Sequence, residues 1–201
     1  EENPDYILGV LREYQLEQNK LEQEKTNQKN ISSIKNLNLA YHPMYLGDSN
    51  SAKVIYEFVD YNCGYCQKFH QELINVMNDN SLKLVIIQMP ILGNFSEELT
   101  KLALASSLQG QFKVVHNYLY STERKSKMED ILADLFLRGV DLDILKNDLD
   151  SQEVSDFLSI HRSYADEFKF TGTPATIIGN QIIPGFIDAD KITEILEKEF
   201  S

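Results

Sequence analysis

Two cysteines three positions apart are the residues of this sequence with the clearest chemistry. Cys63 and Cys66 flank Gly64-Tyr65 and are the only cysteines in the 201 residues. A two-residue spacer lets one thiol reach the other, and a helix N-terminus stabilises the thiolate that performs thiol–disulfide exchange. We expect Cys63, at the helix start and nearer to solvent, to attack a substrate, and Cys66, one turn in, to resolve the mixed disulfide.

A zinc site and an inert structural disulfide are the alternative uses of the cysteine pair. Structural zinc takes four ligands, whereas the sequence has no second CxxC and no paired-histidine motif, and His42, His116 and His161 are scattered. A bridge over so short a loop would also stabilise little. We therefore expect a redox pair with no metal and no cofactor, and we interpret His70 as a surface residue of a helix.

Glu57 is the second candidate, because it is the one acid in an otherwise apolar strand-like segment. A carboxyl group buried there could pass protons to or from Cys66 as a third catalytic group. The alternative is a solvated glutamate on the sheet edge. Asp60 and Tyr61, next to the cysteines, are expected to shape the loop.

Two further positions are candidates for substrate binding. Thr173-Pro174 precedes a predicted strand, where a proline that lacks an N–H group is tolerated, and the sequence alone does not show whether the bond is cis. Tyr65 could stack on a substrate peptide or pack beside its own loop.

The segments around the cysteines predict a parallel sheet. Residues 53–60 and 82–88 have the apolar character of buried strands, and the segment after Cys63 has apolar residues at helical spacing. Strand, helix and strand with a short return predict a right-handed parallel βαβ unit. Residues 37–46 alternate in polarity and predict an edge strand.

The rest of the chain reads as a helical insertion followed by a hairpin and a helix. Residues 94–169 contain five helical patterns, with Asp141 as one N-cap. Residues 175–178 and 181–184 flank the turn Gly179-Asn180, a hairpin signal, and Asp188 caps a last helix.

The N-terminal segment is expected to lie outside this core. Asn3-Pro4 predicts a helix start, and an apolar stripe follows at Ile7, Leu8, Val10, Leu11 and Tyr14. Residues 17–30 are nearly all polar and could form a solvated helix or a flexible linker, with a short helix over 31–36. The stripe could mediate assembly or fold back on its own core.

These patterns together divide the chain into four segments. They are a helix and linker over 1–30, the first half of the core over 31–93, the helical insertion over 94–169, and the second half over 170–201. The formal net charge of −12 argues against nucleic acid and anionic membranes as partners. No apolar run approaches the length of a membrane span.

The sequence around both candidate sites resembles the DsbA family. The run from Tyr56 to Phe69 (YEFVDYNCGYCQKF) and the later TGTPA at 171–175 are most similar to its ScsC and Com1-type branch. The resemblance implies an α/β thioredoxin fold with an inserted helical domain, a cis bond before Pro174, Glu57 as the buried acid and Cys63 as the nucleophile. It also implies an exported, periplasm-like location, and no signal peptide is visible in this chain.

The chain departs from the best-known oxidants of the family in three features. Gly-Tyr replaces Pro-His between the cysteines, Thr173 replaces Val before the proline, and an N-terminal helix with a polar stretch is added. The last feature resembles family members that oligomerise and act as disulfide isomerases.

Three functions remain open from the sequence. We favour an oligomeric disulfide isomerase or reductase, with a trimer as the preferred assembly through residues 1–30. It would act on unfolded or misoxidised exported proteins and be recycled by a redox partner protein. The alternatives are a monomeric dithiol oxidase that introduces disulfides, and a chaperone or metal-binding module on the same fold.

Overall fold

The protein is described by a computed structural model that covers residues 4–37, 44–77 and 81–201. The chain divides into two compact units, Glu1–Leu37 and Asn38–Ser201. The first contains one helix of 33 residues, α1 (Pro4–Asn36). Residues 17–30 are therefore helical rather than a linker, as suits the strong helix formers Gln, Glu and Lys. The predicted short helix over 31–36 is the end of α1, so the first unit extends past residue 30.

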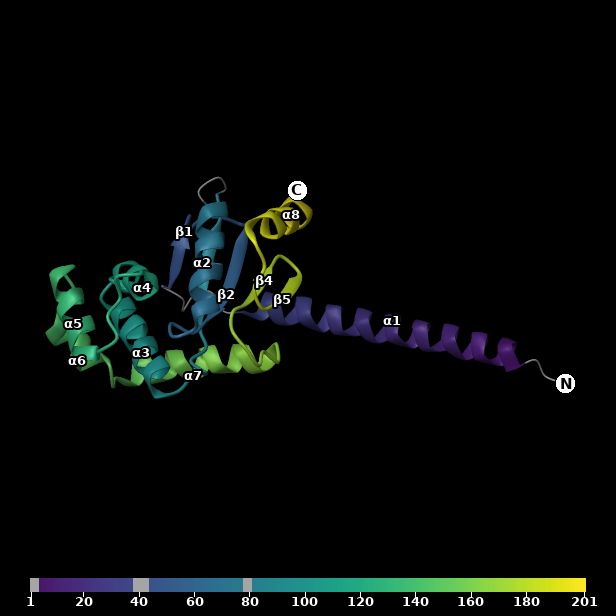
Figure 1. Cartoon of the computed structure of the whole chain (residues 1–201), viewed down its shortest axis with the longest axis horizontal. Helices are drawn as coiled ribbons and strands as arrows, with labels where there is room; N and C mark the ends of the chain where they lie inside the picture. Colours follow the sequence, from purple (N-terminus) through teal and green to yellow (C-terminus); the bar gives the residue numbers. More distant parts are fainter. Residues whose placement is uncertain (1–3, 38–43, 78–80) are drawn as a thin grey trace. The chain divides into compact units, whose positions relative to one another are not determined.

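The second unit alternates strands and helices and carries an inserted run of helices (Figure 1). Its elements are β1 (Tyr45–Gly47), β2 (Val54–Val59), α2 (Gly64–Met77), β3 (Lys83–Gln88), α3 (Asn94–Leu108), α4 (Phe112–Tyr120), α5 (Met128–Leu137), α6 (Leu142–Asp148), α7 (Gln152–Glu167), β4 (Ala175–Ile178), β5 (Gln181–Pro184) and α8 (Ala189–Phe200).

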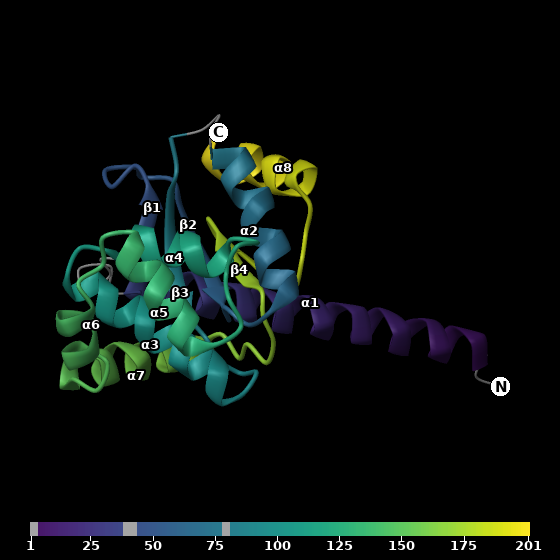
Figure 2. The ribbon, with the colours of Figure 1, turned by 60° about the vertical axis from the view of Figure 1, so that its left-hand side comes forward.

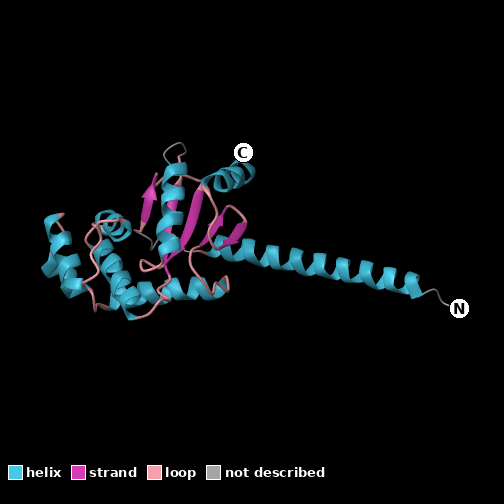
Figure 3. Cartoon of the chain, in the orientation of Figure 1, coloured by secondary structure: helices cyan, strands magenta, loops and turns pink. Residues whose placement is uncertain are grey.

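The five strands form one sheet in the order β1-β3-β2-β4-β5. The strands are drawn in magenta in Figure 3. Strands β2 and β3 are parallel and are joined through α2, which confirms the predicted βαβ unit. The other three pairs are antiparallel, and β4 and β5 form the predicted hairpin. Edge strand β1 is shorter than the predicted strand 37–46, of which residues 38–43 lie outside the described part of the chain.

Strand β2 separates two unlike faces of the sheet. Ile55 and Val59 point to the face that shares a core with α2 and α8. Phe58 points to the other face, where its ring lies 6.1 Å from Phe168 at the end of α7 and 4.7 Å from Phe170. Because side chains alternate along a strand, Glu57 lies on the face of α2.

The inserted helices α3 to α7 lie together between β3 and β4 in the chain, in the teal and green region of both ribbon views (Figures 1 and 2). Asp141 accepts hydrogen bonds from two backbone N–H groups of α6, and Asp188 accepts one at the start of α8, so both predicted N-caps are confirmed. No helix in the described ranges is both long and apolar enough to cross a membrane.

Candidate active site

The cysteines lie where β2 passes into α2, and Asp60 shapes the loop between the two elements. The Asp60 side chain is fully buried and accepts hydrogen bonds from the backbone N–H groups of Asn62, Ile91 and Leu92 at 2.8, 2.9 and 3.0 Å. Its carbonyl oxygen accepts from the N–H of Cys63 at 3.0 Å. One carboxylate thus joins the loop before α2 to the loop after β3, as its predicted loop-shaping role requires.

Cys63 precedes the first residue of α2 and is half-buried. Its sulfur lies 3.4 Å from the backbone nitrogen of Cys66, which donates to it, and 3.5 Å from the carbonyl oxygen of Thr173. A sulfur at the positive end of a helix, with a backbone N–H directed at it, is in the setting that stabilises a thiolate.

Cys66 lies one turn further into α2 and is fully buried. Both cysteines are free thiols in this structure. Burial raises the pKa of the Cys66 thiol, against smaller lowering contributions from the Asp60 backbone and the Thr173 side chain. The two sulfurs therefore differ: one is accessible at a helix end, and the other is held as a thiol inside the core.

The loop before β4 lies beside Cys63. The Thr173–Pro174 peptide bond is cis, as the family resemblance implied. Pro174 is buried and its carbonyl oxygen accepts from Gly185 N–H at 2.9 Å. Tyr65, in contrast, is 66% exposed, with the Lys68 ammonium 5.6 Å from its ring centroid. The structure thus brings Thr173 to the reactive sulfur and leaves Tyr65 open to solvent.

Glu57 is fully buried beneath α2, so the solvated alternative is wrong. Its Oε2 lies 3.0 Å from Nδ1 of His70, and its Oε1 has no hydrogen-bond partner among the described residues. The side chain of Thr176, its register partner on β4, is also buried without a hydrogen bond.

His70 is 3% exposed, so our interpretation of it as a surface residue is wrong. It follows Cys66 by four positions, and the spacing Cys66, His70, Leu73, Met77 places it on the inward face of α2. That spacing is the signal in the sequence for an inward-facing residue at position 70.

His116 of α4 completes a buried polar cluster that the sequence did not indicate. Its Nε2 lies 3.2 Å from Nε2 of His70, and its Nδ1 lies 2.8 Å from the Tyr61 hydroxyl. Burial, with a smaller contribution from His70, lowers the pKa of His116 well below its usual value. The Tyr61 hydroxyl also accepts from Gln88 Nε2 at 3.2 Å. We name the side chains of Glu57, Tyr61, His70 and His116 the buried polar chain.

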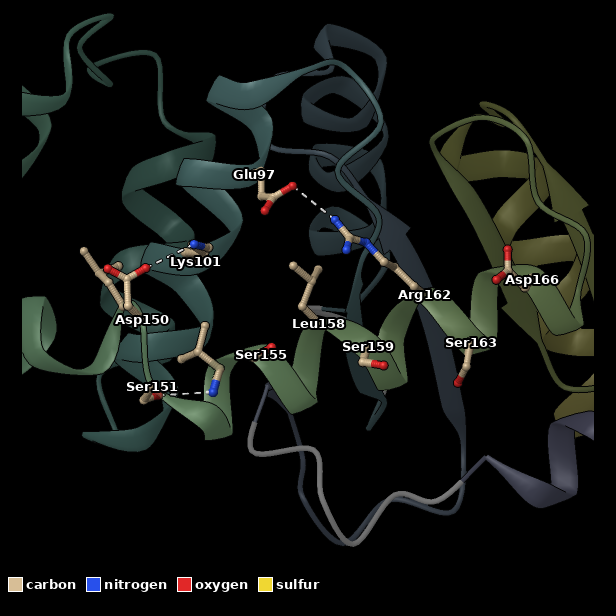
Figure 4. A pocket seen from close by; sticks show the side chains of 12 residues that line it. Glu97, Lys101, Asp150, Ser151, Ser155, Leu158, Ser159, Arg162, Ser163 and Asp166 are labelled. Carbon is tan, nitrogen blue, oxygen red and sulfur yellow. Dashed lines mark hydrogen bonds and ion pairs between the residues drawn. The ribbon is translucent and has the colours of Figure 1, made fainter.

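A groove of about 550 Å³ lies elsewhere, between α3 and α7 (Figure 4). Two ion pairs cross it, Arg162–Glu97 at 3.1 Å and Lys101–Asp150 at 3.2 Å. None of its lining residues belongs to the cysteine loop, the cis-proline loop or the buried polar chain. This groove is therefore separate from the candidate active site at the start of α2.

The thioredoxin family model matches residues 40–198 of the chain. The chain belongs to the thioredoxin family. Among curated proteins, the probable disulfide bond formation protein D of Bacillus cereus is 23% identical over 169 residues, which cover 77% of each chain.

Solved structures place the chain within the DsbA-like part of the thioredoxin family. The thiol-disulfide exchange protein α-DsbA2 of Wolbachia pipientis has a TM-score of 0.78 at 25% identity and covers 88% of this chain and 97% of its own. A linker-deletion variant of Proteus mirabilis ScsC has a TM-score of 0.76 at 19% identity, and the match covers 97% of this chain and 93% of the ScsC chain. At that identity the second likeness shows the fold alone. This thioredoxin-family protein is a thiol–disulfide oxidoreductase with a DsbA-like fold.

Proposed function

We propose that this oxidoreductase is an oligomeric disulfide isomerase or reductase that acts on unfolded or misoxidised exported proteins in a periplasm-like compartment. Cys63 would attack the substrate disulfide, Cys66 would resolve the mixed disulfide, and Glu57 would exchange a proton with Cys66. The asymmetry between the accessible Cys63 sulfur and the buried Cys66 thiol supports these roles.

Substrate peptides would dock against the cis-proline loop. The Thr173 carbonyl oxygen beside Cys63 supports this, because it can accept a main-chain hydrogen bond from an extended peptide that presents its disulfide. Tyr65 would add an exposed aromatic surface next to the reactive sulfur.

The exposed apolar side chains of α1 carry the oligomeric part of the proposal. Leu8, Val10, Leu11 and Tyr14 are between 48 and 64% exposed; the side chain of Ile7 lies outside the described set. Contiguous exposed apolar surface of this kind marks an interaction site. A helix of 33 residues is about 50 Å long. Helices joined side by side, with a trimer preferred, would hold several catalytic units around one substrate.

Light scattering of the full chain, combined with refolding of a scrambled disulfide substrate, tests the proposal. We expect the chain to be an oligomer that restores activity to the scrambled protein. In the proposed function, a redox partner protein returns the cysteines to the dithiol. A chain that is monomeric at micromolar concentration and does not restore activity would contradict it.

The alternative is a monomeric dithiol oxidase. The name of the Bacillus relatives, disulfide bond formation protein, favours it. In the same refolding assay, an oxidase would form disulfides in a reduced substrate but would not rearrange those of a scrambled one.

A further inference from the structure

The buried polar chain connects the acid under the active site to two helices and a loop. Glu57 comes from β2, Tyr61 from the loop before α2, His70 from α2 and His116 from α4. Three contacts of 2.8 to 3.2 Å link the four side chains in sequence, from the Tyr61 hydroxyl through His116 and His70 to Glu57 Oε2. All four are at most 3% exposed, so a hydrogen bond lost here is not replaced by bulk water.

The direction of hydrogen-bond donation along the buried polar chain follows from the contacts of Tyr61, the member furthest from Glu57. Gln88 Nε2 donates to the Tyr61 oxygen, so the hydroxyl proton of Tyr61 is available to His116 Nδ1. His116 Nε2–H then donates to His70 Nε2, which leaves the proton of His70 on Nδ1, directed at the Glu57 carboxylate. The reverse direction would give the Tyr61 oxygen two donors and leave its own proton without an acceptor among the described contacts.

The electrostatic surroundings agree with this direction. Burial raises the pKa of Tyr61 and lowers that of His116, so the first stays a donor and the second stays neutral. Tyr120 of α4 stacks on His70, with ring centroids 4.8 Å apart. Burial raises the pKa of Tyr120, with a smaller contribution from Glu57. Glu57 of β2, Cys66 of α2, and Tyr61 and Cys63 of the loop before α2 are the titratable groups that interact with Tyr120.

We propose that His70, oriented by His116 and Tyr61, is a positioning residue that holds the Glu57 carboxylate through Oε2 and keeps Oε1 free for proton exchange with Cys66. The proposal rests on the proposed function. In the resolving step, the Cys66 thiol gives its proton to Glu57 and its sulfur attacks the Cys63 sulfur of the mixed disulfide. The Cys63–Cys66 bond forms and the substrate leaves as a thiolate, so the cysteine pair loses the two electrons that the substrate gains.

An aromatic disulfide reagent with a coloured thiolate, 5,5′-dithiobis(2-nitrobenzoate), separates the two steps in the full-length reduced protein. Attack by Cys63 releases the first coloured thiolate, and attack by Cys66 on the mixed disulfide releases the second. The first phase reports the proposed function, and the second reports Cys66 and the groups that serve it. Absence of the first phase in the natural protein would overturn the proposed function, whatever the second phase does.

The variants are chosen to separate positioning from folding. His70→Leu removes the donor to Glu57, and we expect the second phase to slow about tenfold, the effect of one hydrogen bond to a charged group, with a shifted pH profile and an unchanged first phase. His70→Asn keeps a donor at the place of Nδ1 and should restore most of the rate. Tyr61→Phe removes only the hydroxyl furthest from Glu57 in the buried polar chain, so it should slow the second phase less than His70→Leu does. It also tests the proposal if His70→Leu does not fold.

Two comparisons complete the test. His161→Asn changes a buried histidine of α7 that is not a member of the buried polar chain. Its Nδ1 accepts from the backbone N–H of Gln88, and asparagine keeps an acceptor for that group, so both phases should stay unchanged. Glu57→Gln should slow the second phase, and the Glu57→Gln/His70→Leu double variant should be no slower than Glu57→Gln. Additive effects in the double variant, or an unchanged second phase in both His70→Leu and Tyr61→Phe, would overturn the proposal.

Discussion

The same amino acid is used in opposite ways in the two units of this chain. Leu73 of α2 is fully buried beside the sheet. Leu11 of α1, in contrast, is 54% exposed, and Leu8, three positions earlier on the same helix, is 64% exposed. The catalytic unit completes its own core within one chain. The first unit presents apolar side chains that its own described contacts do not cover. The comparison sets a unit whose core is complete within one chain against a unit whose apolar side chains, in the proposed assembly, are covered by a second copy.

The sharpest test of the first half of this comparison is loss of the nucleophile. Cys63→Ser should reduce disulfide exchange to the uncatalysed rate, because a hydroxyl does not replace a thiolate as the attacking group. In Cys66→Ser, Cys63 should still attack the substrate disulfide, and the mixed disulfide should accumulate because no resolving thiol remains, which intact mass spectrometry detects. If Cys66, and not Cys63, captures the substrate, the assignment of the two roles is wrong.

A leucine truncated in each unit tests the comparison itself. Leu73→Ala should lower the free energy of unfolding of the catalytic unit by about 2–5 kcal/mol, the range for a buried leucine. Leu11→Ala should leave that free energy unchanged and weaken self-association, measured by analytical ultracentrifugation across a concentration series. Unchanged association in Leu11→Ala, Leu8→Ala and the double variant would remove α1 as the assembly surface.

The alkaline stability of the catalytic unit depends on the buried thiol. Burial raises the pKa of Cys66 in the folded protein, and a Cys63→Ser background keeps that burial. The folded state therefore holds a proton that the unfolded chain loses, so stability is full below the unfolded thiol pKa of about 8.5 and falls as the pH rises above it. The slope approaches about 1.4 kcal/mol per pH unit.

Denaturant titrations between about pH 8 and 9.5, below the ordinary tyrosine pKa of about 10, measure this loss. Cys63→Ser/Cys66→Ala is the control and should lose less stability over the same range, because the buried tyrosines with raised pKa, among them Tyr61 and Tyr120, contribute to both proteins and Cys66 to only one. An equal slope in both proteins would show that a group other than Cys66 is responsible.

Local signals predicted much of the fold, and non-local contacts account for what they missed. The βαβ unit, the hairpin at Gly179-Asn180 and the cap at Asp188 follow from periodicity, turn chemistry and capping within a few residues. The pairing of His70 with His116 joins residues 46 positions apart, through a helix that belongs to the insertion, and no short pattern encodes it. The sequence leaves the length of α1 open because a polar stretch of helix formers is compatible with both a helix and a linker.

The smallest expected effect concerns Thr173, the position before the cis proline that distinguishes this chain from the best-known family oxidants. Its backbone carbonyl oxygen lies 3.5 Å from the Cys63 sulfur, and its side chain lowers the pKa of the Cys66 thiol against the larger effect of burial. Thr173→Val keeps the carbonyl and the volume and removes only the hydroxyl. The reduced form should lose an interaction worth at most one hydrogen bond, about 1 kcal/mol, so the reduction potential should fall by no more than about 20 mV. Thr173→Ser keeps the hydroxyl and should stay near the natural potential, measured against a glutathione buffer. A Ser variant that shifts as far as the Val variant would show that packing of the methyl group, and not the hydrogen bond, sets the potential at this position.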